Sequence, residues 1–126
     1  MVAATGVLQN IDEKEWLKSR SNFTWTPIKQ KIKTAGGQVK TSYQLFPESE
    51  KEIKMLIYKQ DNIHDFAWFA DKRFIVNTDT CRLNSGRIID VYSYYIPEEK
   101  DVWQQSVSFA KEATRHYSGL VGEYPY

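Results

Sequence analysis

The chain has 126 residues, of which 41% are hydrophobic and 26% are charged, as expected for a single globular domain. An aromatic content of 14% supplies bulky apolar surface for a core and argues against intrinsic disorder. Seventeen basic against 16 acidic residues leave a net charge of +1, which provides no general attraction for nucleic acid or anionic lipid, so we expect no nucleic-acid partner.

The first predicted elements are a short strand and a short helix. Residues 2–9 are predicted to form a strand that is covered on both sides, because apolar side chains point to both of its faces. Asp12 is expected to cap a helix with acidic residues in its first turn, where the helix dipole favours them. Trp16 and Leu17 should lie on the buried side of this helix, which we expect to end near Arg20.

Between residues 22 and 46 the pattern is that of two strands joined by a turn. Gly36 and Gly37 can supply the positive φ that a tight hairpin needs, and residues 41–46 are the expected return strand. The lysines of this region alternate along the strands, a pattern typical of a solvated face: Lys29, Lys31, Lys33 and Lys40. We interpret the region as a lineage-specific hairpin or a surface flap.

Two further strands are predicted over residues 52–60 and 64–70. The second carries apolar groups on both faces, which is typical of a central strand. We therefore expect Trp68 to be buried, with its strand covered on both sides.

A second hairpin is predicted from residues 73–83 and 87–96, because the Asn-Ser-Gly sequence at 84–86 favours a turn. In its return strand, Val91 and Tyr95 should share one face, and Tyr92 and Tyr94 the other.

The periodicity then changes to that of a helix. Acidic residues after Pro97 suit a first helical turn, and apolar residues recur at spacings of three, four and seven. We predict one helix over residues 99–118, about 30 Å long at 1.5 Å per residue, ended by Gly119 or Gly122. The elements together predict an α+β fold, in which an antiparallel β region precedes one long C-terminal helix.

Few residues are candidates for catalysis or metal binding. A catalytic zinc site takes three protein ligands, and the strongest peptidase signature places two histidines four residues apart on a helix. The only histidines are His64, in a predicted strand, and His116, near a helix end, so we predict no metal site and no catalytic or cofactor-binding residue. His64 and Asp65 would diverge as neighbours in a strand, and we interpret one of them as satisfying a backbone group.

Cysteine content and hydropathy restrict the class of protein further. Cys81 is the only cysteine, so no internal disulfide forms, and we interpret it as a buried or half-buried thiol. No apolar run approaches the roughly twenty residues that cross a bilayer, which predicts no membrane span. Residues 1–6 lack the basic and apolar regions of a signal peptide. Periplasmic, secreted and cytoplasmic locations all remain open.

Two segments resemble a known enzyme family. Residues 61–70, Asp-Asn-Ile-His-Asp-Phe-Ala-Trp-Phe-Ala, and residues 117–126, Tyr-Ser-Gly-Leu-Val-Gly-Glu-Tyr-Pro-Tyr, are similar to segments of bacterial members of the aminopeptidase N family. These gluzincin zinc metallopeptidases also include leukotriene hydrolase. A weaker similarity lies at residues 4–8, Ala-Thr-Gly-Val-Leu.

The resemblance implies a place for the chain within a larger enzyme. Residues 1–97 would form the C-terminal part of the family's β-sandwich-like N-terminal domain. Residues 98–126 would form the first helix and the Tyr-Pro-Tyr turn entering the catalytic domain. The family's zinc helix and its substrate-anchoring Gly-x-Met-Glu-Asn loop would follow Tyr126, and none of the family's catalytic or metal-binding residues maps onto this sequence.

The implied function is that of a non-catalytic structural fragment of a zinc aminopeptidase, whose parent removes N-terminal residues from peptides. Its main partner would be the remainder of its own polypeptide. Zinc is expected in the parent enzyme and not in this chain, and a peptide substrate would be bound only through the parent.

Two other interpretations stay open. One is a free-standing β-rich module that binds a protein or ligand without enzymatic activity, and the other is a small, degenerate, non-catalytic paralogue. In the fragment interpretation, the C-terminal helix should expose apolar residues, because they spread too widely for one narrow stripe. Exposed apolar patches and open sheet edges favour association, so we expect self-association through this helix or a sheet edge.

Overall fold

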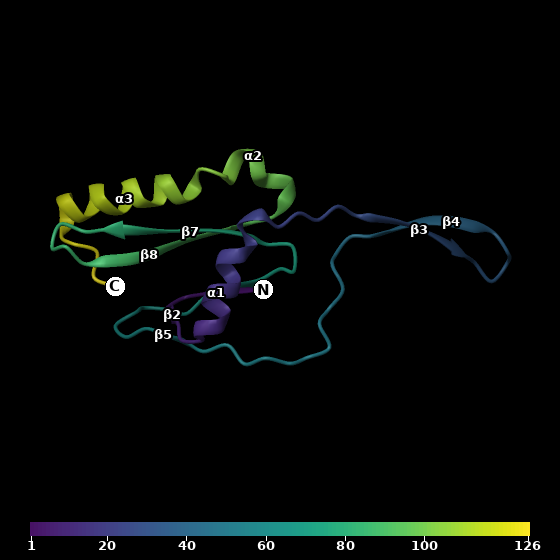
Figure 1. The fold of residues 1–126 in the computed structure, drawn as a ribbon, viewed down its shortest axis with the longest axis horizontal. Coiled ribbons are helices and arrows are strands. Elements are labelled where there is room, and N and C mark those ends of the chain that lie inside the picture. Colours follow the sequence, from purple (N-terminus) through teal and green to yellow (C-terminus); the bar gives the residue numbers. More distant parts are fainter.

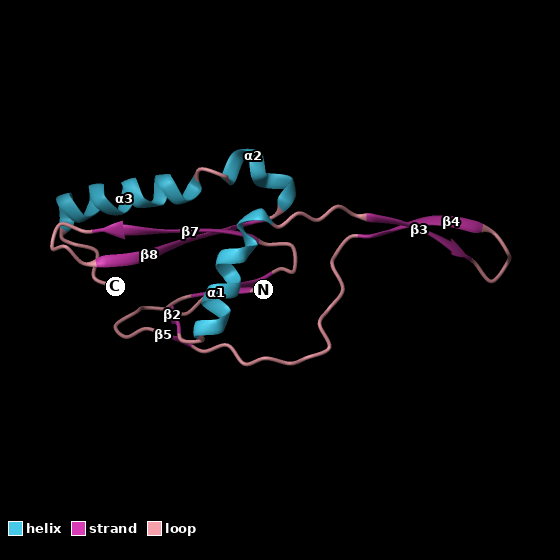
Figure 2. Cartoon of the chain, viewed as in Figure 1, coloured by secondary structure: helices cyan, strands magenta, loops and turns pink.

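The computed structural model describes all residues, 1–126, and has an α+β architecture of helices and four separate two-stranded antiparallel sheets (Figure 1, Figure 2). The predicted fold class is therefore confirmed. Only 10 of the 126 residues are buried, so the core is small and much apolar surface stays accessible.

The strand predicted over residues 2–9 is divided in two, and the prediction that it is covered on both sides is wrong, since Val7 is 51% exposed while Leu8 is buried. β1 (Val2–Ala4) pairs with β6 (Trp68–Ala70), whereas β2 (Val7–Leu8) pairs with β5 (Tyr58–Lys59). Gly6 separates β1 from β2 with a φ of +98°, and a Cβ there would lie 2.9 Å from the backbone of β5. Only glycine fits such a position, so the chain turns here from one partner strand to the other.

The segments predicted as strands over residues 52–60 and 64–70 are mostly extended loop, with only β5 and β6 paired. The prediction that Trp68 is buried is wrong, since its side chain is 65% exposed and that of Phe69 is 66% exposed. The physical reason is that β6 pairs only with β1, in a sheet of two strands.

The predicted helix is α1 (Ile11–Ser19), followed by the short 3-10 helix η1 (Arg20–Asn22). Leu17 is buried as predicted, but Trp16 is 40% exposed. Its ring lies beside charged side chains instead, 4.3 Å from Lys54 Nζ. The helix begins one residue before Asp12, so the predicted cap is wrong.

β3 (Ile28–Lys33) and β4 (Val39–Gln44) form a hairpin that extends away from the rest of the molecule (Figure 1). The turn includes Gly37, whose φ is +77°, so the predicted glycine hairpin is confirmed. The return strand begins at Val39, two residues earlier than predicted.

β7 (Ile75–Arg82) and β8 (Ile88–Tyr95) form the predicted second hairpin and turn through Gly86 with a φ of +90°. The helix α3 (Ser106–Val121) runs alongside this hairpin (Figure 2). Ser93 of β8 points toward α3, and its hydroxyl contacts that of Ser106 at 2.5 Å.

The predicted single helix over residues 99–118 is interrupted. It consists of η2 (Pro97–Glu99), α2 (Lys100–Trp103) and α3. At the break, the Asn77 side chain donates to Gln104 O at 3.3 Å, and the Ser106 hydroxyl donates to Trp103 O at 2.5 Å. These side chains donate hydrogen bonds to backbone carbonyl groups that would otherwise accept from backbone N–H groups in a continuous helix, which accounts for the interruption.

The core lies where α1, β2 and β7 meet. Leu8, Leu17 and Val76 form the buried cluster, with exposures of 7%, 1% and 0%. Partly buried side chains surround it: Met1, Leu56, Tyr58, Phe74, Tyr92 and Tyr94. The core therefore joins the N-terminal helix to the β7–β8 hairpin.

Candidate functional site

A cavity of about 650 Å³ lies between β2, β5, β8 and the C-terminal residues 124–126. This volume falls in the range of small-molecule pockets, which are mostly apolar with a few polar groups. Five tyrosines contribute to its lining: Tyr58, Tyr92, Tyr94, Tyr124 and Tyr126.

Strand alternation places two of these tyrosines. Tyr92 and Tyr94 are two residues apart in β8, so both point to one face, as predicted, opposite Ser93 and α3. Their rings are nearly parallel, with centroids 6.3 Å apart, and Phe74 meets Tyr94 edge-on at 5.7 Å. Tyr92 and Tyr94 therefore form an aromatic wall on one side of the cavity, and Phe74 packs against Tyr94 without lining it.

Burial disfavours ionisation of three of the cavity phenols. It raises the pKa values of Tyr58, Tyr92 and Tyr94 above their ordinary value of 10.0, because the phenolate is poorly solvated there. The hydroxyl of Tyr58 donates to Val2 O at 2.8 Å. At neutral pH the wall therefore offers aromatic rings and neutral hydroxyl groups.

The C-terminal segment closes one side of the cavity through contacts with the β7–β8 turn. Arg87 donates to Pro125 O at 3.2 Å and also to Tyr124 O. Glu123 accepts from Ser85, at 2.8 Å from the amide and 2.6 Å from the hydroxyl, and these bonds lower the pKa of Glu123.

The structure brings together the two segments that carry the family resemblance. The hydroxyl of Tyr126 donates to Asn62 O at 2.7 Å, across 64 residues of sequence. Ile63 and Tyr124 also line the same cavity. The site therefore forms where residues 61–70 and 117–126 approach each other.

The candidate residues identified from sequence are not assembled into this site. His64 and Asp65 are exposed before β6, and neither side chain forms a hydrogen bond, so the interpretation that one satisfies a backbone group is wrong. His116 is exposed and packs edge-on against Tyr117 at 5.6 Å. No three metal-ligating side chains lie together. Cys81 is fully buried, which agrees with its interpretation as a buried or half-buried thiol.

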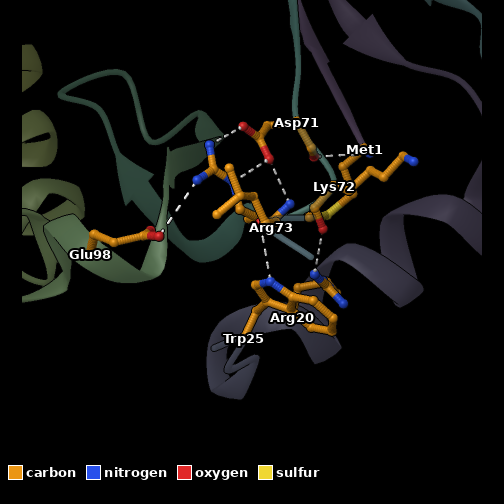
Figure 3. A network of polar contacts seen from close by, with 8 residues as sticks. Met1, Arg20, Trp25, Asp71, Lys72, Arg73 and Glu98 are labelled. Carbon is orange, nitrogen blue, oxygen red and sulfur yellow. Dashed lines mark hydrogen bonds and ion pairs between the residues drawn. The ribbon is translucent and has the colours of Figure 1, made fainter. Parts of the chain in front are cut away.

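A polar network that sequence reasoning missed ties the N-terminal part to the start of β7 (Figure 3). Arg73 donates to Asp71 at 2.8 Å and reaches Glu98 at 3.5 Å. The hydrogen bonds from Arg73 lower the pKa of the Asp71 carboxyl. Arg20 donates to the carbonyls of Lys72 and Phe74, both at 3.3 Å.

Arg20 occupies an unusual environment within this network. Burial lowers the pKa of its guanidinium, and its Nε is buried without a hydrogen-bond partner. The ring of Phe23 lies 3.3 Å from the guanidinium carbon, and such stacking partly replaces lost hydration. We interpret this network as structural, because its carboxylates and most of its donors find partners within the chain and none of its arginines lines the tyrosine cavity.

Comparison of the chain with known protein families, with curated proteins and with solved structures finds no match. The resemblance to the aminopeptidase N family therefore rests on residues 61–70 and 117–126 and stays a prediction. None of the helices combines the length and apolar character that crossing a membrane requires.

Proposed function

We propose that this chain is a non-catalytic structural part of a zinc aminopeptidase of the aminopeptidase N type. The observation that carries the proposal is the contact between the two segments with family resemblance, in which Tyr126 hydrogen-bonds Asn62. Contact between these segments is expected if both belong to one ancestral framework.

Exposed apolar side chains support a role inside a larger protein. Within the segment 61–70, Phe66, Trp68 and Phe69 are 56–66% exposed. On α3, Leu120 and Val121 are 65% and 82% exposed. Extensive apolar exposure of this kind is typical of surfaces that pack against another body. The remainder of the same polypeptide is the proposed partner.

In such a parent, the chain would act as scaffold. The β7–β8 hairpin with α3 would connect the β domain to the catalytic domain and orient one relative to the other. A zinc-activated water in the parent would hydrolyse the N-terminal peptide bond of a substrate. The proposal assigns no zinc ligand and no catalytic residue to this chain.

The direct test is to read the natural coding sequence downstream of the codon for Tyr126. We expect an open frame that encodes a helix with a His-Glu-x-x-His motif. A stop codon at that point, or a downstream region without such a helix, would overturn the proposal.

A solution experiment can test the proposed packing surface independently. A variant in which Trp68 is the only tryptophan should be strongly quenched by acrylamide in the 126-residue chain, since its side chain is 65% exposed. In a longer chain that includes the downstream domain, quenching should fall. Equal quenching in both chains would place Trp68 outside any such interface.

The cavity supports a second candidate function, that of a free-standing module binding a small ligand with aromatic or apolar groups. Its volume of about 650 Å³ and its tyrosine wall suit such a ligand. Thermal-shift screening with small aromatic compounds tests this candidate. A hit should be lost in Tyr92→Ala and kept in Tyr117→Ala, whose side chain lies outside the cavity.

A further inference from the structure

The β3–β4 hairpin has an open edge with an ordered row of lysines. Thr34 N donates to Gln38 O at 2.8 Å beside the turn. Counting back along the chain from Thr34, every second residue of β3 therefore directs its backbone N–H and C=O groups toward β4. The intervening residues are Lys29, Lys31 and Lys33, whose backbone groups therefore point away from β4. Their side chains share one face and form no ion pair.

The loop after the hairpin carries a matching row of opposite charge. Glu48, Glu50 and Glu52 alternate along it, are exposed, and form no ion pair. Ile53 follows them and is 100% exposed. Residues 48–53 belong to no strand and make no hydrogen bond between backbone groups. Their one hydrogen bond runs from Lys72 Nζ to the Ser49 hydroxyl, so their backbone groups are available for pairing.

We propose that residues 48–53 of a second copy of this chain add to the free edge of β3 as an antiparallel strand, forming a dimer. One register matches four exposed pairs at once: Lys33 with Glu48, Lys31 with Glu50, Lys29 with Glu52, and Ile28 with Ile53. Opposite charges and apolar side chains that face each other across strands are favourable cross-strand pairs.

The backbone requirements of this register are also met. The glutamates would lie opposite the residues of β3 whose N–H and C=O groups point outward, so hydrogen bonds can form between the two strands. Pro47, which has no N–H, falls at a position whose backbone points away from β3. A parallel arrangement would preserve the charge matches but would place Ile53 opposite Thr34.

The segment of the same chain cannot take this position. β4 ends at Gln44, which pairs with Ile28, whereas Glu48 must lie opposite Lys33 beyond the far edge of β3. The separation is about 17 Å along the strand and about 10 Å across it. The four residues from Gln44 to Glu48 span at most about 14 Å, so the occupant comes from a second copy.

A lysine row also fits an anionic polymer such as nucleic acid. The net charge of +1 and the glutamate row beside the hairpin disfavour that partner.

In a two-fold symmetric dimer, the glutamate segment of each copy pairs with the lysine edge of the other copy, so the same interface forms twice. Residues 28–53 lie outside the segments of family resemblance, so the dimer is independent of the proposed function.

A charge exchange tests the dimer in solution. The full chain and two variants, K29E/K31E/K33E and E48K/E50K/E52K, are compared by sedimentation velocity. The wild type should dimerise, more weakly as salt is raised. Each variant alone places like charges across the interface and should dimerise at least about tenfold more weakly. An equimolar mixture of the two variants should form a heterodimer, because every edge then meets a segment of opposite charge.

A matched control changes net charge without touching the interface. The variant D61K/E99K/E112K alters three exposed acids that form no ion pair, and it should dimerise like the wild type. Far-UV circular dichroism checks that each variant is folded. A wild type that stays monomeric throughout, or a mixture no more associated than its separate components, overturns the proposal. A monomer that binds an oligonucleotide through the lysines would overturn it too and assign the row to polyanions.

Discussion

Replacement of Leu17 by alanine tests whether the small core determines stability. Its side chain is 1% exposed and packs with Leu8 and Val76, so it joins α1 to β2 and β7. Leucine-to-alanine changes in cores cost about 2–5 kcal/mol, depending on the cavity that remains. Leu17 already borders the tyrosine-lined cavity, so part of the lost volume opens into existing space. We therefore expect a loss of about 2–3 kcal/mol, in the lower part of that range.

Urea unfolding followed by far-UV circular dichroism measures this loss. With the slope of about 1–3 kcal/mol per molar urea that is typical of small proteins, the midpoint should fall by roughly 0.7–3 M. Ile11→Ala is the matched control, because Ile11 lies on the same helix but is 74% exposed. It should change stability by no more than about 0.5 kcal/mol. Equal midpoints for the two variants would refute the location of the core.

Four other measurements probe separate parts of the structure. Trp68→Ala should change the free energy of unfolding by no more than about 1 kcal/mol, because the side chain is 65% exposed; urea titration showing a loss above 3 kcal/mol would indicate burial. Hydrogen bonds from Arg73 hold the pKa of Asp71 below 3.8, so this pair stabilises the fold above that pH and loses its contribution as pH falls below it. Asp71→Asn should therefore flatten the decline of the urea midpoint between about pH 5 and pH 2. Burial raises the pKa of Tyr94 above 10.0, so ultraviolet titration should show fewer phenols ionising near pH 10 in the folded chain than in urea, and Tyr94→Phe should remove one late-ionising group. Cys81 is 0% exposed and should react with Ellman's reagent only after denaturation; rapid reaction of the folded chain would contradict its placement.

The sequence by itself determined the features that depend on local conformation. Gly37 and Gly86 adopt positive φ, a requirement of the turn that neighbouring residues impose, so both hairpins were predictable. Strand alternation likewise assigned Tyr92 and Tyr94 to one face of β8, because successive side chains point to opposite sides of any strand. Trp16 and Leu17 were both predicted on the buried side of their helix, but only Leu17 is buried.

The tertiary structure alone decided whether an apolar side chain is covered by another element of the fold. Apolar residues on both faces of residues 64–70 show that the strand can be buried, but only the arrangement of neighbours shows that Trp68 is exposed. The break between α2 and α3 is another example, since the Asn77 side chain that takes the Gln104 carbonyl comes from 27 residues earlier.

The cavity and the network around Arg20 depend on the same kind of distant contact. Tyr126 reaches Asn62 across 64 residues, and Arg20 reaches Phe74 across 54. No periodicity encodes such contacts, because they form only when hydrophobic burial has brought separate elements together. Local sequence thus selects turns and side-chain faces, whereas the site arises from long-range packing of the C-terminal segment against the strands.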